Sequence, residues 1–317
     1  MIADARLVGT VLSGNIDDYP DGIIMPVDKP YRWTSADVVR KLKWAACRHF
    51  GKKNLKVGHA GTLDPLATGV LLVCIGKATR LAESLQKEGK EYVAGISFGA
   101  TTPSYDLEKA VDRTYPFDGV TEESLREVLP KFIGEQDQVA PLFSAKSVDG
   151  VRAYELARRQ FRERGLAKTE VIEDFDHTVA ETLNIQRVKI SELELVSFCS
   201  AGVPSDSGRV HPRFAAAEYG RNPRHPRTNP DSAEKTDTNE ERPNPRINVA
   251  DISGLDLVQA EIRIACSKGT YIRALARDLG EALGSGAFLH SLCRTKSGGF
   301  NVETALSVSE AMELLAI

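Results

Sequence analysis

The stretch Val57–Arg80 contains the residues with the clearest potential for chemistry, and Asp64 stands at its centre. Gly58 and Gly61 permit backbone conformations that other residues adopt only at a cost, and Pro65 biases Asp64 away from the helical region. We therefore predict a tight turn between the two glycines, followed by a stiff, non-helical loop that carries one carboxylate. Because position and environment set the reactivity of a carboxylate, this arrangement suits a catalytic group.

The loop needs an element behind it, and the apolar run Val70–Ile75 is the nearest candidate. Its length fits either a buried strand or the start of a core helix. A simpler interpretation of Asp64 also stays open on spacing alone, since an aspartate before a proline often only closes a turn.

Periodic patterns on both sides of this stretch predict the remaining framework. Residues 35–49 repeat apolar side chains at helical spacing, with Thr34 or Ser35 as the cap and Asp37 placed for a capping box. The opposite face of this helix is basic, which is typical of a solvated surface. The other expected elements are strands at 22–27, 89–99, 184–199 (one strand or two with a break) and 257–266, helical segments at 81–85, 120–133, from about 270 and 306–315, and a loop at 134–141.

Three motifs together resemble the TruB family of RNA pseudouridine synthases. They are GTLDPLATGVL at 61–71, CSKGTYIRALARDLGEALG at 266–284, and DKP at 28–30 followed by Ser35. The resemblance covers roughly 22–160 and 255–312. It implies an α+β fold, with a mixed, largely antiparallel sheet and helices around a central catalytic cleft. It also implies an isomerase that converts uridine-55 in the T loop of tRNA to pseudouridine.

The resemblance assigns roles to individual residues. Asp64 matches the nucleophile, and Arg273 matches the arginine that pairs with it and keeps it charged. Tyr92 matches the tyrosine that stacks on the target base, Leu292 the leucine of the uracil pocket, and His59 a histidine that wedges into the RNA. Substrate contacts are also expected from Lys29, Gly61, Thr62 and Lys146. Without the resemblance, Tyr92 is an ordinary strand aromatic and Arg273 is a helix-surface arginine.

These matches imply the following domain organisation. Residues 1–21 are an N-terminal extension and 22–317 a TruB-type catalytic domain. Within it, about 135–170 resembles a thumb-like RNA-binding segment. No sequence follows the catalytic domain for the small RNA-binding PUA domain that many relatives carry. The thumb is basic, although a solvated helix face is the alternative. Its cationic residues include Lys146, Arg152, Arg158, Arg159, Arg162 and Arg164.

Residues from about 201 to 250 have a different composition, with seven of the 15 prolines and few large apolar side chains. Such a segment buries too little apolar surface to offset its ordering entropy, so we predict a disordered insertion between two strands. A tolerated loop is the simpler interpretation of this insertion, and a basic tether for RNA is the alternative.

Composition limits the classes of protein to consider. With 42% hydrophobic and 27% charged residues among 317, the chain is that of an ordinary globular protein. We find no signal core and no run of transmembrane length, so we expect a cytoplasmic protein. The five cysteines form no CxxC pair, which predicts reduced thiols and no metal site. The net charge of −3 leaves RNA binding open, because RNA needs only a local basic cluster. We expect tRNA, through its T stem-loop, as the partner, with no cofactor, no membrane and a monomeric state.

Two other classes of function are alternatives to a synthase. An RNA-binding or RNA-folding module would keep the basic thumb but would not need Asp64. A glycosidase normally uses two carboxylates that flank one bond, and the Asp64 loop contains no second acid.

Overall fold

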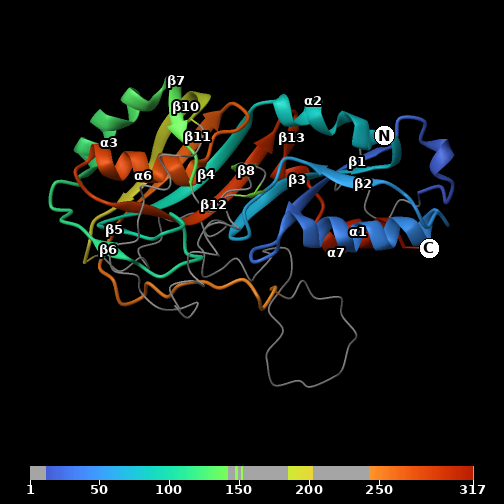
Figure 1. The fold of residues 1–317 in the computed structure, drawn as a ribbon, viewed down its shortest axis with the longest axis horizontal. Coiled ribbons are helices and arrows are strands. Elements are labelled where there is room, and N and C mark those ends of the chain that lie inside the picture. Colours follow the sequence, from blue (N-terminus) through green and yellow to red (C-terminus); the bar gives the residue numbers. More distant parts are fainter. Residues whose placement is uncertain (1–11, 142–146, 149–150, 153–184, 203–242, 317) are drawn as a thin grey trace. The chain divides into compact units, whose positions relative to one another are not determined.

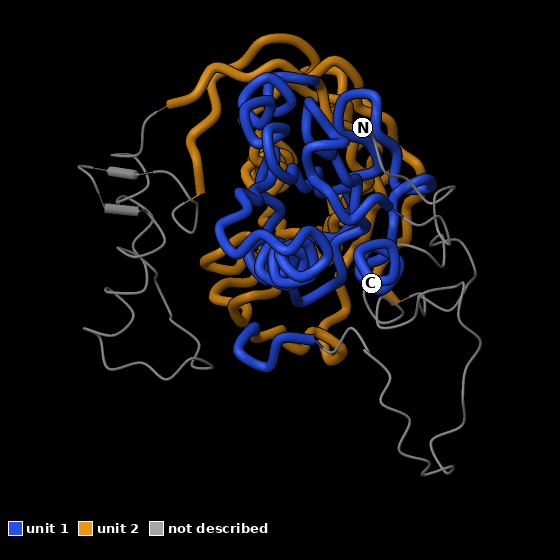
Figure 2. The backbone as a smooth tube through the Cα atoms, turned by 90° about the vertical axis from the view of Figure 1, so that its right-hand side faces the viewer, with its two compact units in different colours: residues 1–88, 211–247, 293–317 blue, residues 89–210, 248–292 orange. Residues whose placement is uncertain are grey.

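A computed structural model describes residues 12–141, 147–148, 151–152, 185–202 and 243–316. The chain divides into two units, which are described one at a time (Figure 2). Unit 1 comprises Met1–Glu88, His211–Ile247 and Cys293–Ile317, and unit 2 comprises Gly89–Val210 and Asn248–Leu292.

The sheet of unit 1 is built around β3 (Ala67–Ile75), in which every residue is buried. Strand β1 (Ile23–Lys29) pairs with it antiparallel, from Ile23 opposite Ile75 to Lys29 opposite Gly69. Strand β2 (Val57–Ala60) also pairs antiparallel with β3. The choice left open by the apolar run at 70–75 is thus resolved in favour of a strand.

Helix α1 (Ser35–His49) of unit 1 has the predicted bounds and the predicted cap. The Thr34 side chain accepts from the Asp37 backbone N–H, and the Asp37 carboxylate accepts from the Thr34 backbone N–H. One face of α1 is buried, through residues that include Val38 and Leu42. Helix α7 (Val308–Leu314) contacts both α1 and β1 (Figure 1).

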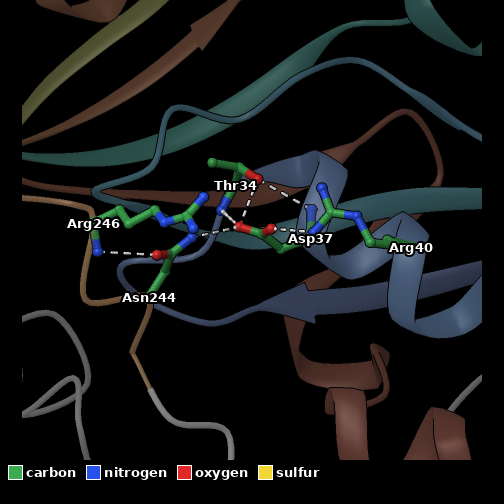
Figure 3. A network of polar contacts seen from close by, with 5 residues as sticks. All are labelled: Thr34, Asp37, Arg40, Asn244 and Arg246. Carbon is green, nitrogen blue, oxygen red and sulfur yellow. Dashed lines mark hydrogen bonds and ion pairs between the residues drawn. The ribbon is translucent and has the colours of Figure 1, made fainter.

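Residues 243–247, within unit 1, fold against the start of α1 (Figure 3). Asn244 donates from Nδ2 to Asp37 Oδ2 at 3.1 Å, and its backbone N–H donates to the Arg32 carbonyl at 3.0 Å. Arg32 in turn donates to the carbonyl of Ile247, whose side chain is buried. Although they lie inside the range of the predicted insertion, these residues have defined contacts.

Unit 2 contains four consecutive antiparallel strands. Their order is β4 (Lys90–Phe98), β11 (Val258–Cys266), β10 (Ile185–Cys199) and β7 (Gly134–Val139). Strand β12 (Ala287–Ser297) is the other neighbour of β4, and the boundary between the units falls inside β12, after Leu292. Helix α6 (Ile272–Ala282) contacts β4.

The smaller elements complete the described structure. The helices are α2 (Ala82–Lys87), α3 (Glu122–Val128), η2 (Ile16–Asp18), η3 (Gly76–Leu81), η4 (Leu129–Phe132) and η5 (Val302–Thr304). The short strands are β5 (Ala100–Thr101), β6 (Arg113–Thr114), β8 (Ser147–Val148), β9 (Val151–Arg152) and β13 (Phe300–Asn301).

The predicted α+β class, with a mostly antiparallel sheet, is confirmed. Two local predictions are wrong. The loop expected at 134–141 contains β7, which pairs with β10 at the end of the strand order. Its sequence, GEQDQV, is almost entirely polar and shows no apolar alternation that would indicate a strand. Residues 58–60 of the tight turn expected at 58–61 instead belong to β2, because Gly58 can also adopt the extended backbone that pairs with β3. The segment at 184–199 is one strand, and its break takes the form of two register shifts against β11.

Candidate active site

Asp64 lies in unit 1 on the connection between β2 and β3. Residues 61–66 contain no helix or strand, as predicted, and Gly61 has a φ of +97° that favours glycine. The backbone carbonyl of Asp64 accepts from Ala67 N–H at 3.1 Å, so this residue does close a turn through its main chain. The residue as a whole is only partly buried.

Lys29, the last residue of β1, is completely buried behind this loop. Its ammonium group donates to the carbonyls of Trp33 at 2.6 Å, Pro30 at 3.0 Å and Pro65 at 3.3 Å. Burial lowers the pKa of Lys29 to about 7, and the negative charges of Asp64 and Asp28 oppose part of that shift. Lys29 therefore ties β1 to the Asp64 loop and adds a positive charge near its carboxylate.

Arg294, within β12, holds both ends of the same loop. It is 1% exposed and donates from Nε to the Val70 carbonyl at 2.7 Å. Its Nη2 and Nη1 donate to the carbonyls of Gly61 at 3.1 Å and Thr62 at 3.4 Å. One guanidinium group thus donates to three backbone carbonyls, two in the irregular loop and one in β3. Arg294 is not among the site residues predicted from the sequence, because its contacts are with residues more than 220 positions earlier in the chain.

Two further contacts fix the loop within unit 1. Ser35, at the start of α1, accepts from Leu63 N–H at 2.9 Å and donates to the Leu63 carbonyl at 3.1 Å. Asp28 accepts from Gly69 N–H at 3.1 Å. Gly69 has a φ of +96°, and a Cβ placed there would lie 2.2 Å from the Arg294 carbonyl oxygen. The loop is consequently positioned by a helix and three strands of the same unit.

His59 belongs to β2, where it lies opposite Val73. Partial burial, and then the positive charge of Arg294, lower the pKa of its imidazole below the ordinary value. The role of His59 as a wedge in the RNA stays a prediction.

The second predicted catalytic residue, Arg273, lies in unit 2 near the start of α6. It is 4% exposed, donates from Nη1 to the Ser104 carbonyl at 3.0 Å, and has its Nε 3.7 Å from an Asp106 carboxylate oxygen. The start of α6 is held by Gln138, which accepts from Tyr271 N–H at 2.8 Å and donates to the Tyr271 carbonyl at 3.2 Å. Arg273 is thus a buried, oriented cation rather than a helix-surface arginine.

The residues expected to form the base pocket also belong to unit 2. Tyr92 lies in β4 opposite Ile264 and is 9% exposed, and Leu292 lies in the neighbouring strand β12. Their contact with a uracil, and the pairing of Arg273 with Asp64, stay predictions. Lys146 and most of the predicted thumb lie outside the described residues.

Within the described ranges, no three histidine, cysteine, aspartate or glutamate side chains are grouped so that they could hold a metal ion. In the same part of the chain, no helix combines the length and the apolar character that crossing a membrane requires.

Comparisons with known proteins agree with these observations. Residues 48–203 match the family model described as "TruB family pseudouridylate synthase (N terminal domain)". A protein of Phocaeicola vulgatus named tRNA pseudouridine synthase B is 39% identical over 298 residues, which cover 94% of this chain and 95% of the relative. A protein of that name from Bacteroides thetaiotaomicron is 40% identical over 91% of each chain, and one from Thermus thermophilus is 37% identical over 90% of this chain and 75% of the relative.

Among solved structures, a chain of the "Crystal Structure of a Cbf5-Nop10-Gar1 Complex" is similar in fold, with a TM-score of 0.50 and 24% identity. The match covers 92% of this chain and 54% of that one, so this chain spans about half of its length. The similarity concerns the fold alone.

Proposed function

Because this chain belongs to the TruB family of pseudouridylate synthases, we propose that it is a tRNA pseudouridine synthase that isomerises uridine-55 in the T loop. The membership confirms the predicted family and the predicted class of enzyme, an isomerase. The proposal that tRNA is the substrate is supported by the names of the relatives, which match nearly the whole chain.

The observation that carries the proposal is the fixed position of the Asp64 loop. Two buried basic side chains, Lys29 and Arg294, hold the backbone on both sides of Asp64, while Asp64 itself stays partly exposed. Catalysis gains when a reactive group is held in place before the substrate arrives. Asp64 is accordingly assigned as the nucleophile that acts on a uridine flipped out of the RNA stack.

The reaction balances without a redox partner. The bond between ribose C1′ and uracil N1 breaks, the uracil turns within the site, and a bond between C1′ and C5 forms. The proton lost from C5 is matched by one gained at N1, so substrate and product are isomers. No cofactor is required for this balance.

The remaining roles follow the chemistry of the step. Tyr92 stacks on the extruded base, and Leu292 lines the uracil pocket. Arg273 pairs with Asp64 and keeps it ionised, which is how an arginine near a carboxylate acts. His59 fills the space that the base leaves in the RNA stack. Lys29, Gly61, Thr62 and Lys146 are proposed contacts of the substrate or of the loop that receives it.

The proposed position is tested with two unmodified tRNA transcripts that differ only at nucleotide 55, which is uridine in one and cytidine in the other. We expect the purified protein to form pseudouridine at position 55 of the first transcript and none in the second. Pseudouridine at another position in both transcripts would show that the enzyme acts on a different uridine.

A further inference from the structure

The exposed face of α1 forms a basic groove that the proposed reaction does not use. This Trp44 groove has a volume of about 380 Å³ and is lined by Arg40, Lys43, Trp44, Cys47, Arg48 and Lys53. Between residues 35 and 56 the sequence carries seven lysines and arginines and a single acid, Asp37, although the whole chain has a net charge of −3. The groove is therefore a local basic surface on a slightly acidic protein.

Most of this charge is available to a ligand. Arg40 pairs with Asp37 at 2.8 Å, but no carboxylate of the described residues forms an ion pair with Lys43, Arg48 or Lys53. Uncompensated cations at this density repel one another, and binding a polyanion relieves that repulsion. The charge of the groove thus complements a chain of phosphates.

An aromatic ring lies among these cations. Trp44 is 57% exposed, and the guanidinium carbon of Arg48 lies 4.7 Å from the centroid of its ring. Large aromatic side chains beside arginine or lysine are the surface on which proteins bind the bases and backbone of nucleic acids.

The groove is also fixed relative to the Asp64 loop. Ser35, the first residue of α1, exchanges two hydrogen bonds with Leu63 in that loop. Trp44 follows nine residues later, roughly 14 Å along the helix axis. An RNA that rests on the groove is therefore held at a set distance from Asp64 by a single rigid helix within unit 1.

We infer that the Trp44 groove binds the sugar–phosphate backbone of the RNA substrate beside the uridine that enters the active site. Lys43 and Arg48 contact phosphates, and Trp44 packs on a ribose or an unpaired base. This inference rests on the proposed function for the identity of the RNA, but it concerns affinity and not chemistry. It extends the RNA-binding surface from the predicted thumb to α1.

The test uses the full-length protein and a whole tRNA transcript, with the dissociation constant measured at several salt concentrations. Lys43→Gln/Arg48→Gln should weaken binding about tenfold and lower the salt slope by roughly 1.5 to 2, because two phosphate contacts are lost. Trp44→Ala should weaken binding at least about fivefold and leave the slope unchanged, since stacking carries no counterion release. All three residues are exposed, so the variants should fold normally.

The matched control is Arg126→Gln/Lys131→Gln, which removes two exposed cations of unit 2. We expect a wild-type affinity and a wild-type single-turnover rate from the control. Unchanged affinity of the groove variants, or an equal loss in the control, would overturn the inference. If the wild type forms no pseudouridine while the groove variants still lose affinity, the proposed function fails and the groove stands.

Discussion

At the scale of single residues, the structure depends on two buried basic side chains, Lys29 and Arg294. A buried charge is tolerated only where hydrogen bonds and opposite charges replace water. Lys29 and Arg294 meet this condition mainly through backbone carbonyls of the Asp64 loop and its neighbours. The same contacts that make the cations tolerable therefore give the loop one conformation.

Replacing Arg294 tests this dependence. Arg294→Met should lower kcat at least about tenfold and the free energy of unfolding by roughly 2–4 kcal/mol, because one buried and two part-buried carbonyls lose their donor. Arg294→Lys keeps the charge but provides a single donor group, so it should recover the stability only in part. The measurements are single-turnover kinetics and urea unfolding. A wild-type kcat for a folded Arg294→Met variant would show that the loop holds its position without this arginine.

The depressed pKa of Lys29 predicts how stability depends on pH. Its folded-state pKa is about 7 against an ordinary value of 10.5, so between these values the unfolded chain binds more protons than the folded one. The free energy of unfolding should therefore rise with pH from about 7 to 10, by at most roughly 1.4 kcal/mol per unit from this group. Urea unfolding at several pH values should show a shallower rise in Lys29→Met, and equal slopes in the two proteins would contradict the assignment.

Some of these site residues could be predicted from the sequence, and others could not, for a physical reason. Asp64 was recognisable, since its glycine and proline neighbours dictate an irregular loop that can be seen locally. Arg294 was not, because its role depends on contacts with residues more than 220 positions earlier. Lys29 belongs to the DKP motif and could be predicted as a site residue. Its complete burial could not, because burial results from the packing of unit 1 and no local pattern indicates it.

At the scale of elements, the irregular loop requires a close approach of two strands. Gly69 in β3 has no room for a side chain, since a Cβ would lie 2.2 Å from the backbone of Arg294 in β12. Gly69→Ala should lower the free energy of unfolding by roughly 2–4 kcal/mol, through this clash and the strain of a positive φ.

The matched control is Gly119→Ala, where an added Cβ would meet nothing within 4 Å and the φ is not positive. Its effect on the same urea unfolding curve should stay within about 1 kcal/mol. Equal effects of the two substitutions would mean that the β3 strand can shift away from β12 at little cost.

Elements with a strong period were predictable from the sequence, and those without one were not. The bounds of α1 and its Thr34–Asp37 cap could be predicted because apolar spacing and capping chemistry are both local. Strand β7, with the sequence GEQDQV, has no apolar alternation, and its pairing with β10 joins residues about 50 positions apart. Such an edge strand is defined by its partner and not by its own sequence.

At the scale of the whole chain, residues 203–242 and 243–248 should differ in their importance for stability. Replacing 203–242 with a Gly/Ser linker of equal length should change the free energy of unfolding by less than about 1 kcal/mol, since its composition offers little apolar burial. Replacing 203–248 in the same way should cost about 2–4 kcal/mol, because it also removes the Asn244 contacts and the buried Ile247. Equal stability of the two variants would show that the contacts in Figure 3 contribute nothing.

The same pair of variants tests the alternative that the segment tethers RNA. If the linker variant at 203–242 binds tRNA with the wild-type dissociation constant and salt slope, the basic side chains of this segment make no contact with the substrate. A lower slope would assign part of the RNA-binding surface to it.

Asp64 is the residue proposed as the essential nucleophile of a tRNA pseudouridine synthase. The most direct measurement is pseudouridine formation in an unmodified tRNA transcript by the wild type and by Asp64→Asn, with tRNA affinity measured for both. We predict product from the wild type, none from Asp64→Asn, and dissociation constants that agree within about threefold, because the amide preserves the shape of the side chain but is not nucleophilic. Product from Asp64→Asn would contradict the assignment of the nucleophile, and tight binding without product from either protein would contradict the synthase.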